Sequence, residues 1–276
     1  MSEATEAQHA PIRGRATVLA NEADGSGRRL RLAVPAWPGS IPGQFLMIGP
    51  GALSDVPRSD PLLPRPMAVY RDATESATPE VEVLYQIVGR GTTLLSEMTA
   101  GQSVGLVGPL GRGFPVEAGN ALAILVGGGT GIASLYSLAR ALVDLGRPVV
   151  VILGARDKSG LLARDDFAGL DAELICTTED GSEGHRGLVT EPLAERLAAD
   201  PTASVFAVGP TPMMKACAEL AAQRGAKCFV SLENPMACGF GVCLGCAAPR
   251  SEGGFSLVCR AGPVFEATEI DWEGLP

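Results

Sequence analysis

Four cysteines near the C-terminus have the spacing of an iron–sulfur site. Cys238, Cys243 and Cys246 are separated by four and by two residues, and Cys259 follows after twelve more. This is the plant-type arrangement for a [2Fe–2S] cluster, in which four thiolates converge on two irons. The glycines between these cysteines let the backbone approach the cluster closely. The four thiols are therefore the predicted metal ligands.

A structural zinc ion is the alternative for these cysteines, because zinc is also held by four thiolates. Zinc sites favour paired C-x2-C knuckles, and only one pair in this segment has that spacing. A cluster carries negative charge, which Arg250 and Arg260, nearby in the sequence, would offset. The other cysteines, Cys176, Cys217 and Cys228, lie in apolar segments and are predicted to be core residues.

A second set of residues has the chemistry to bind phosphate. Arg65 begins the segment 65–70, at the expected edge of a barrel, and an arginine there can pair bidentately with a pyrophosphate. In the segment 88–93, glycines precede a short helix whose first N–H groups can bind phosphate. A third glycine-rich element covers residues 108–114. Each of the three is also compatible with an ordinary turn.

A glycine-rich loop at residues 127–133 joins an expected strand to an expected helix, where phosphates can approach the helix N-terminus. It departs from the strict G-x-G-x-x-G pattern. Arg156 stands near the end of the next strand, where an acidic partner for the ribose would be expected. Residues 209–213 also end a strand and start a helix, at the sheet edge where ligands bind. These loops predict a site for a nicotinamide nucleotide.

Composition limits the possible functions. Of the 276 residues 46% are hydrophobic and 19% charged, which predicts a packed globular protein of two or three modules. Lys and Arg number 22 against 31 Asp and Glu, a net charge of −9, and aromatic residues make up only 5%. Nucleic acid and anionic membrane surfaces are therefore not expected as partners.

The chain is expected to be cytoplasmic. Its N-terminus lacks the basic and apolar regions of a signal peptide, and the apolar stretch near 121–126 is too short to span a membrane. Thiols stay reduced in the cytoplasm, so the seven cysteines need an explanation other than disulfides.

The first half of the chain reads as short strands. Residues 1–10 are expected to be a disordered tail, and turns containing Pro and Gly punctuate the chain from Gly14 to about Pro115. This pattern predicts a small antiparallel barrel. The expected strands cover 16–23, 28–35, 44–50, 67–71, 81–88 and 103–110, with one short helix at 91–98.

From about residue 120, buried strands alternate with amphipathic helices, which predicts a parallel, doubly wound sheet covered on both faces. The expected strands cover 121–129, 149–156, 172–180 and 204–209, and the expected helices cover 133–146, 188–200 and 210–225. After Gly225 the alternation is expected to stop. The predicted fold is therefore mixed: an antiparallel β-barrel domain (11–116), an α/β nucleotide domain (117–224) and a small cluster domain (225–276).

The order of the motifs is more informative than any one of them. Arg-Pro after a barrel strand, Gly-x-Gly-Thr, Gly-Pro-Leu-Gly, the glycine-rich loop, Gly-Pro-x-Pro-Met and a four-cysteine loop follow one another. In this order the chain resembles the ferredoxin-reductase-like flavoproteins, most closely the electron-transfer subunits of NAD-dependent, class 1B dihydroorotate dehydrogenase. The resemblance runs from about Arg15 to Trp272 and is most specific at 236–246 and 258–265, with 178–182 also similar.

The resemblance implies a barrel that binds FAD, a nucleotide domain that binds NAD as a substrate, and a cluster domain that faces a partner. It assigns no catalytic acid or base to this chain. The residues expected to hold FAD are Arg65, Pro66, Met67, Ala68, Gly91 and Thr92. The loop residues expected to bind NAD are Gly127, Gly128, Gly129, Thr130 and Gly131.

The implied partner is an FMN-containing dihydroorotate dehydrogenase catalytic subunit, in a heterotetramer that serves pyrimidine biosynthesis. Electrons would pass singly to the [2Fe–2S] cluster, then to FAD, and as a hydride to NAD+. Phe240, Val242 and Leu244 around the cluster suit an exposed docking surface. The alternative is that these side chains pack under the loop.

Two rival functions remain open. A ferredoxin- or sulfide-linked NAD(P)H oxidoreductase subunit would share the first two domains, but such relatives often alter the first cluster ligand, here Cys238. An iron–sulfur redox-sensing regulator would need no FAD. The sequence also departs from the family twice. Ala68 stands where a Ser is common, and the insertion at 51–60 is longer than expected.

Overall fold

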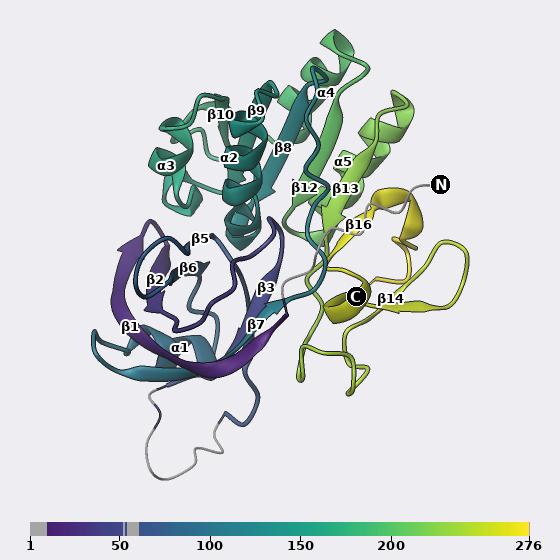
Figure 1. The fold of residues 1–276 in the computed structure, drawn as a ribbon. Coiled ribbons are helices and arrows are strands. Elements are labelled where there is room, and N and C mark those ends of the chain that lie inside the picture. Colours follow the sequence, from purple (N-terminus) through teal and green to yellow (C-terminus); the bar gives the residue numbers. More distant parts are fainter. Residues whose placement is uncertain (1–9, 52, 54–60, 276) are drawn as a thin grey trace.

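The computed structural model describes residues 10–51, 53 and 61–275. Two seven-stranded sheets, one antiparallel and one mostly parallel, lie one above the other, and a C-terminal segment packs beside both (Figure 1). The predicted tail at 1–10 and the insertion at 51–60 fall almost entirely outside the described residues. Within the described part of the chain, no helix is both long enough and apolar enough to cross a membrane.

The N-terminal sheet is a curled antiparallel half-barrel with the strand order β4-β3-β7-β1-β2-β6-β5. Alternate residues of its strands, such as Leu30 with Leu32 and Val81 with Val83, are fully buried and fill its concave side. Its elements are β1 (Ile12–Asp24), β2 (Gly27–Ala33), β3 (Phe45–Ile48), β4 (Arg65–Ala68), β5 (Arg71–Ala73), β6 (Glu80–Tyr85), α1 (Arg90–Ser96) and β7 (Ser103–Leu110). The antiparallel sheet expected from the sequence is confirmed.

The second sheet has the order β11-β10-β9-β8-β12-β13-β16 and is parallel except at its last strand. Its central strands are apolar on both faces: Ile124 packs toward one pair of helices and Leu125 toward the other. The strands are β8 (Ala123–Gly128), β9 (Val149–Ala155), β10 (Glu173–Thr178), β11 (His185–Arg186), β12 (Ser204–Val208) and β13 (Cys228–Ser231). Helices α2 (Tyr136–Asp144) and α3 (Arg164–Ala168) cover one face, and α4 (Thr190–Ala199) and α5 (Thr211–Gln223) cover the other.

The strand–helix alternation extends further than the sequence suggested. Strand β13 follows α5 and pairs in parallel with β12, and β16 (Val264–Glu266) pairs antiparallel with β13. The cysteine-rich segment therefore lies between two neighbouring strands of the nucleotide sheet. It also contains the hairpin β14 (Ala247–Pro249) and β15 (Phe255–Leu257), and the short helix α6 (Val258–Ala261).

The three cysteines outside the cluster motif lie in the second sheet and its helices. Cys217 on α5 and Cys228 on β13 are buried in one core cluster, and Cys176 on β10 is half-buried against the other. Their prediction as core residues is confirmed.

Candidate functional site

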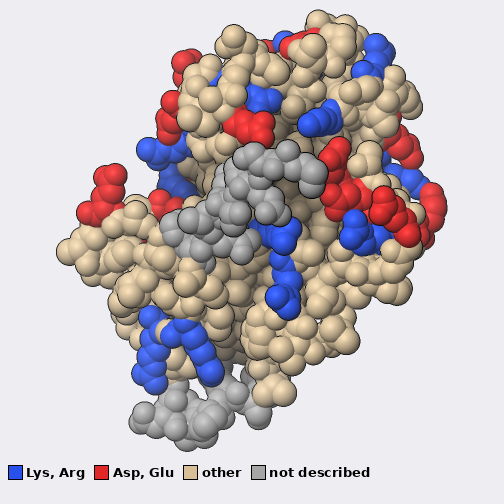
Figure 2. All heavy atoms as spheres, turned by 45° about the vertical axis from the view of Figure 1, so that its right-hand side comes forward, with Lys and Arg blue, Asp and Glu red and all other residues tan. Residues whose placement is uncertain are grey.

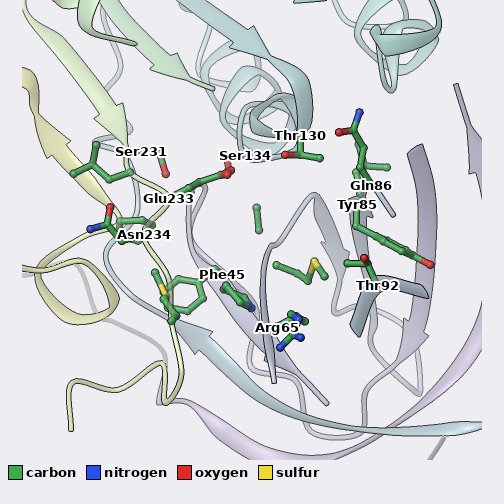
Figure 3. A pocket seen from close by; sticks show the side chains of 18 of the residues that line it. Phe45, Arg65, Tyr85, Gln86, Thr92, Thr130, Ser134, Ser231, Glu233 and Asn234 are labelled. Atoms are coloured by element: carbon green, nitrogen blue, oxygen red, sulfur yellow. The ribbon is translucent and has the colours of Figure 1, made fainter. Parts of the chain in front are cut away.

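A pocket of about 260 Å³ lies where the half-barrel, the nucleotide sheet and the cysteine-rich segment meet (Figure 3). Strands β3 and β4 and the end of β6 form one side. The turn Gly129–Ser134 before α2 and the chain at and after the end of β13 form the other. The predicted FAD residues that line it are Arg65, Pro66, Met67, Ala68 and Thr92, and Thr130 of the glycine-rich loop joins them. The structure therefore brings parts of both predicted nucleotide sites to one cavity.

Strand β4 places four of these residues in the wall of the pocket. It pairs antiparallel with β3, so that Met47 lies opposite Pro66 and Phe45 opposite Ala68. The guanidinium of Arg65 donates to the carbonyl oxygens of Leu63 at 2.9 Å and Pro64 at 3.4 Å through Nη1.

Thr92 has a local structural role in addition to the one expected. Its hydroxyl accepts hydrogen bonds from the N–H groups of Val88 at 3.0 Å and Gly89 at 3.2 Å, and donates to the Gly89 carbonyl at 2.9 Å. The side chain thus fixes the turn that starts α1, which also sets the position of Gly91 beside Arg65. Its part in a phosphate site remains a prediction.

The glycine-rich loop is packed tightly rather than left open along its length. A Cβ atom on Gly131 would lie 2.6 Å from the Val208 carbonyl, and one on Gly128 would lie 2.7 Å from the sulfur of Met213. Gly127 is similarly close to Leu135, whereas Gly129, at φ +57°, faces open space. These glycines therefore hold the ends of β8 and β12 together, and Thr130 is the residue of the loop that reaches the pocket.

The four cluster cysteines fall into two contacting pairs. Cys238 and Cys243 are within hydrogen-bonding contact, and so are Cys246 and Cys259, where the Cys259 N–H donates to Cys246 Sγ at 3.5 Å. A [2Fe–2S] cluster held by four cysteines needs two thiolates for each iron, and this pairing would supply them. Among the described residues no three His, Cys, Asp or Glu side chains form a group that could hold a single metal ion.

The loop backbone favours ionised sulfur at its first cysteine. Burial disfavours the Cys238 thiolate, but the N–H groups of Cys243, Phe240 and Val242 point at the sulfur and lower the pKa of Cys238 to about 6. Burial and the adjacent Cys246 thiol instead raise the pKa of Cys259 to about 12. Backbone donors aimed at sulfur are the surroundings that an anionic cluster requires, so the loop fits this cofactor.

Glycines bring the cluster loop against its neighbours. Gly239, at φ +81°, packs on Met47 of β3, where a Cβ would come within 2.5 Å of Met47 Cγ. Gly241, at φ +87°, leaves space for Arg260, whose Cδ would be 2.3 Å from a Cβ there. The first contact joins the cluster loop to the wall of the pocket, and the second places a cation beside the loop.

The sequence did not predict the side of the pocket formed by the end of β13 and the residues after it. Ser231, Glu233 and Asn234 line it, and Asn234 is fixed by donating from Nδ2 to the Ala247 carbonyl at 3.0 Å. Ser134, from the turn before α2, contributes a further hydroxyl to the pocket (Figure 3). Recognising residues 228–231 as a short parallel strand could have pointed to these residues, but the Cys-rich composition of the segment obscured the strand.

Among the described residues that line the pocket, Glu233 is the acidic side chain and Arg65 the basic one. The Glu233 side chain is accessible to solvent in the cavity, but protein surrounds the cavity. This desolvation raises the pKa of Glu233 above its ordinary value.

Apolar side chains around the cluster loop are exposed. Phe240, Val242 and Leu244 expose 54%, 74% and 63% of their surface, and Phe255 on the adjacent hairpin exposes 73%. Residues 235–249 contain no Asp, Glu, Lys or Arg. Figure 2 brings this side of the molecule forward and shows Lys and Arg at its centre and lower left, and uncharged residues at its lower right. The three predicted residues are therefore on the surface rather than packed under the loop.

Comparison with known proteins gives the class first. Residues 125–219 match the oxidoreductase NAD-binding domain, and residues 233–271 match the iron-sulfur cluster binding domain of dihydroorotate dehydrogenase B. The structure of an NADH-dependent reduced ferredoxin-NADP oxidoreductase superposes with a TM-score of 0.81 at 30% identity, covering 94% of this chain and 90% of that one. A ferredoxin reductase of carbazole 1,9a-dioxygenase has the same fold, with a TM-score of 0.65 at 21% identity. The chain is a ferredoxin-reductase-like, NAD-linked flavoprotein oxidoreductase with an iron–sulfur domain.

Curated relatives narrow this class. The dihydroorotate dehydrogenase B (NAD(+)) electron transfer subunit of Desulforamulus reducens is 35% identical, over 85% of this chain and 88% of its own length. The corresponding subunit of Caldanaerobacter subterraneus is 40% identical, over 83% and 86%. The chain belongs to the family of electron-transfer subunits of dihydroorotate dehydrogenase B. The match to an iron–sulfur domain decides against zinc, and the match to an oxidoreductase decides against a regulator.

Proposed function

We propose that this chain passes electrons from an FMN-containing dihydroorotate dehydrogenase catalytic subunit to NAD+, through its [2Fe–2S] cluster and FAD. The family membership, the NAD-binding domain and the cluster domain support this function. The individual residues assigned to each cofactor, and the assembly with the partner as a cytoplasmic heterotetramer, are parts of the proposal.

One observation carries the proposal: the cluster loop and the pocket share a wall. Met236 lines the pocket two residues before Cys238. Gly239 packs directly on Met47, whose cross-strand neighbour Pro66 lines the pocket as well. Two cofactors held at these places would be neighbours, as electron transfer between them requires.

The chain's own residues have distinct tasks in this scheme. Arg65 would pair with the FAD pyrophosphate, and β4 would hold the flavin ring through Pro66, Met67 and Ala68. Gly91 leaves space for the Arg65 guanidinium. When bound, the cluster exchanges single electrons, and the flavin converts them into hydride chemistry with NAD+. The protein positions both groups and excludes water.

The glycine-rich loop would bind NAD at the carboxyl edge of the second sheet. Residues Gly127 to Gly131 lie there, and Thr130 reaches the pocket from that side. This is the sheet edge where nucleotides bind in doubly wound folds. Thr130 is thus placed between the nucleotide sheet and the β4 wall.

The partner would dock on the exposed apolar surface of Phe240, Val242, Leu244 and Phe255. An electron must leave the cluster for a flavin on another polypeptide, so the cluster must lie near a surface that the partner covers. A patch of exposed apolar side chains, most of it in the uncharged segment 235–249, suits a protein interface better than a free surface.

The test is purification of the chain with and without its partner. The chain alone should contain about one FAD and two irons with two acid-labile sulfides. With an FMN-containing catalytic subunit it should reduce NAD+ when dihydroorotate is supplied. A chain with flavin and cluster that gives no dihydroorotate-dependent NAD+ reduction with this subunit would contradict the proposal.

A ferredoxin-linked NAD(P)H oxidoreductase subunit is the second candidate. The structural similarity at 30% identity to a ferredoxin-NADP oxidoreductase favours it, but the curated relatives at 35–40% identity favour the first function. The protein that co-purifies with the chain distinguishes the two functions. An FMN-containing subunit supports dihydroorotate oxidation, and a ferredoxin-dependent subunit in its place supports the ferredoxin-linked function.

A further inference from the structure

Tyr70 and Asp166 join the two sheets through one short hydrogen bond. Tyr70 follows β4 by two residues and is completely buried, and Asp166 lies on α3 of the nucleotide sheet. The Tyr70 hydroxyl donates to Asp166 Oδ2 at 2.5 Å across a sequence separation of 96 residues. The Asp166 carboxylate on the nucleotide-sheet helix therefore accepts a hydrogen bond from a residue just beyond β4, the strand that lines the pocket.

Two arginines of the half-barrel complete an inter-sheet network with this pair. Arg29 Nη2 lies 2.6 Å from Asp166 Oδ2, and Arg71 Nη1 lies 3.8 Å from Asp166 Oδ1. Both guanidinium groups also lie against the Tyr70 ring, at 5.1 and 5.4 Å from its centroid. The Glu82 carboxylate pairs with both arginines, at 3.0 Å from Arg71 Nε and 3.7 Å from Arg29 Nη1.

The ionisation states suit this network at neutral pH. Burial and the hydrogen bond to Asp166 raise the pKa of Tyr70, so the hydroxyl keeps its proton. Burial acts to raise the pKa of Asp166, but the hydrogen bonds from Tyr70 and Arg29 lower it overall. Donor and acceptor are thus both in the form that the hydrogen bond needs.

A second contact supports the same junction from the turn between β1 and β2. Asp24 Oδ1 accepts from the Ala163 N–H at 3.0 Å, and the Ser26 N–H donates to the Ser159 carbonyl at 2.6 Å. Gly25, at φ +54°, is where the two parts touch, since a Cβ there would be 2.2 Å from the Ser159 oxygen. The sheets are therefore joined at two places on the same side.

The network is connected to both sides of the pocket. Tyr70 is two residues beyond Ala68, which lines one side. Its ring packs on Tyr136 at the start of α2, with centroids 4.9 Å apart, and the chain just before Tyr136 supplies Ser134 and Thr130 to the other side. A shift of Tyr70 relative to Asp166 would change the separation of the two sides.

We propose that Tyr70 and Asp166 are positioning residues for hydride exchange, and that they fix the nucleotide sheet at the distance from β4 at which the nicotinamide and the flavin react. The inference rests on the proposed function. The reaction balances as NADH + FAD → NAD+ + FADH−, with the C4 hydride of NADH carrying both electrons. Hydride transfer needs reacting atoms about 3–3.5 Å apart, and a misplacement of about 1 Å can cost on the order of a hundredfold in rate.

The experiment is anaerobic stopped-flow reduction of the bound flavin by NADH in the purified, cofactor-loaded protein. It compares wild type with Tyr70→Phe, Asp166→Asn and the double variant. Asp165→Asn is the matched control, because Asp165 is exposed on the same helix and the substitution changes charge equally. Flavin content and the thermal unfolding midpoint are recorded for every protein.

Each single variant is expected to lower the limiting rate of flavin reduction by about tenfold. Tyr70→Phe removes the charge-assisted hydrogen bond, and Asp166→Asn replaces its charged acceptor by a neutral amide. The apparent Kd for NADH should change by less than about twofold. The double variant should be no slower than Asp166→Asn, because that substitution already weakens the hydrogen bond that Tyr70→Phe removes, together with the ion pairs to Arg29 and Arg71. The Asp165→Asn protein should match wild type.

The outcomes separate this inference from the function on which it rests. A wild-type protein that holds FAD but is not reduced by NADH would overturn the proposed function. Normal wild-type reduction together with limiting rates within twofold of wild type in the Tyr70→Phe protein would overturn the positioning role. Should Asp166→Asn unfold, Tyr70→Phe alone decides, since it removes one oxygen and keeps the ring contact with Tyr136.

Discussion

The backbone of Gly91 lies directly against the guanidinium of Arg65: a Cβ atom at Gly91 would come within 2.5 Å of Arg65 Nε and 2.8 Å of Cζ. Gly91 is buried, and its φ is not in the left-handed region. The residue is therefore a glycine because of the space that the arginine occupies, not because of its backbone conformation. The two predicted FAD residues depend on each other.

Gly91→Ala is expected to weaken FAD binding by displacing Arg65. Arg65→Ala should have a similar effect, costing about 1.5–3 kcal/mol, or roughly a tenfold to hundredfold loss of affinity, if the arginine pairs with the pyrophosphate. Gly89→Ala is the matched control, because a Cβ there meets nothing within 4 Å. Flavin retained after dialysis is the measurement, and full retention in the Arg65→Ala protein would show that the pyrophosphate is held elsewhere.

Cys243→Ser is expected to remove the iron and its visible absorption bands while FAD remains bound. One member of the Cys238–Cys243 pair is lost, so one iron lacks a thiolate ligand, whereas the pocket keeps all its lining residues. Cys176→Ser on β10 is the control and should retain two irons. Iron, sulfide and flavin are measured in each protein. A normal iron-to-protein ratio in Cys243→Ser would disprove the ligand assignment.

Leu244→Asp is expected to prevent co-purification with the catalytic subunit and to leave both cofactors in place. Leu244 exposes 63% of its surface and has φ +59°, a conformation that Asp tolerates better than Leu, so the fold should not suffer. NADH oxidation with a small artificial acceptor should continue. Leu145→Asp at the exposed end of α2 is the control. Assembly unaffected by Leu244→Asp would place the interface elsewhere.

Glu233→Gln is expected to stabilise the protein at neutral pH. The folded state binds the Glu233 proton more tightly than the unfolded chain, because desolvation by the protein around the cavity raises the pKa of this carboxyl. The free energy of unfolding therefore decreases as pH rises from the ordinary value of 4.5 through the raised one. Glutamine at position 233 does not ionise, so the variant avoids this decrease in the free energy of unfolding. Denaturant unfolding of both proteins at pH 4 and pH 7, at equal flavin content, measures the difference in their free energies of unfolding. A variant less stable than wild type at pH 7 would contradict the expected stabilisation.

The sequence was sufficient for the features that depend on local spacing. The cysteine intervals predicted an iron–sulfur site, and residues 233–271 match an iron-sulfur cluster binding domain. The change from short strands to strand–helix alternation near residue 120 separated the two sheets. Arg65 to Ala68 also lie in a pocket, as expected. In each case the signal lies in one continuous stretch of sequence and needs no contact between distant segments.

Features that depend on distant contacts were not predicted. Strand β13 has four residues, too few for a periodic pattern, and its position became clear only through pairing with β12 and β16. Glu233 reaches the pocket for the same reason. Neither Tyr70 nor Asp166 belongs to a motif that the sequence reveals. They lie 96 positions apart and come into contact because the two sheets pack together.

The pairing of β16 with β13 makes the cysteine-rich segment an integral part of the nucleotide sheet and not a detachable module. A shortened protein that ends before Val264 would leave one side of β13 without a hydrogen-bonding neighbour. Exposed strand edges recruit other strands, so such a truncation is a predicted source of self-association. Attempts to transplant or delete the iron–sulfur unit should therefore keep residues 228–231 and 264–266 together.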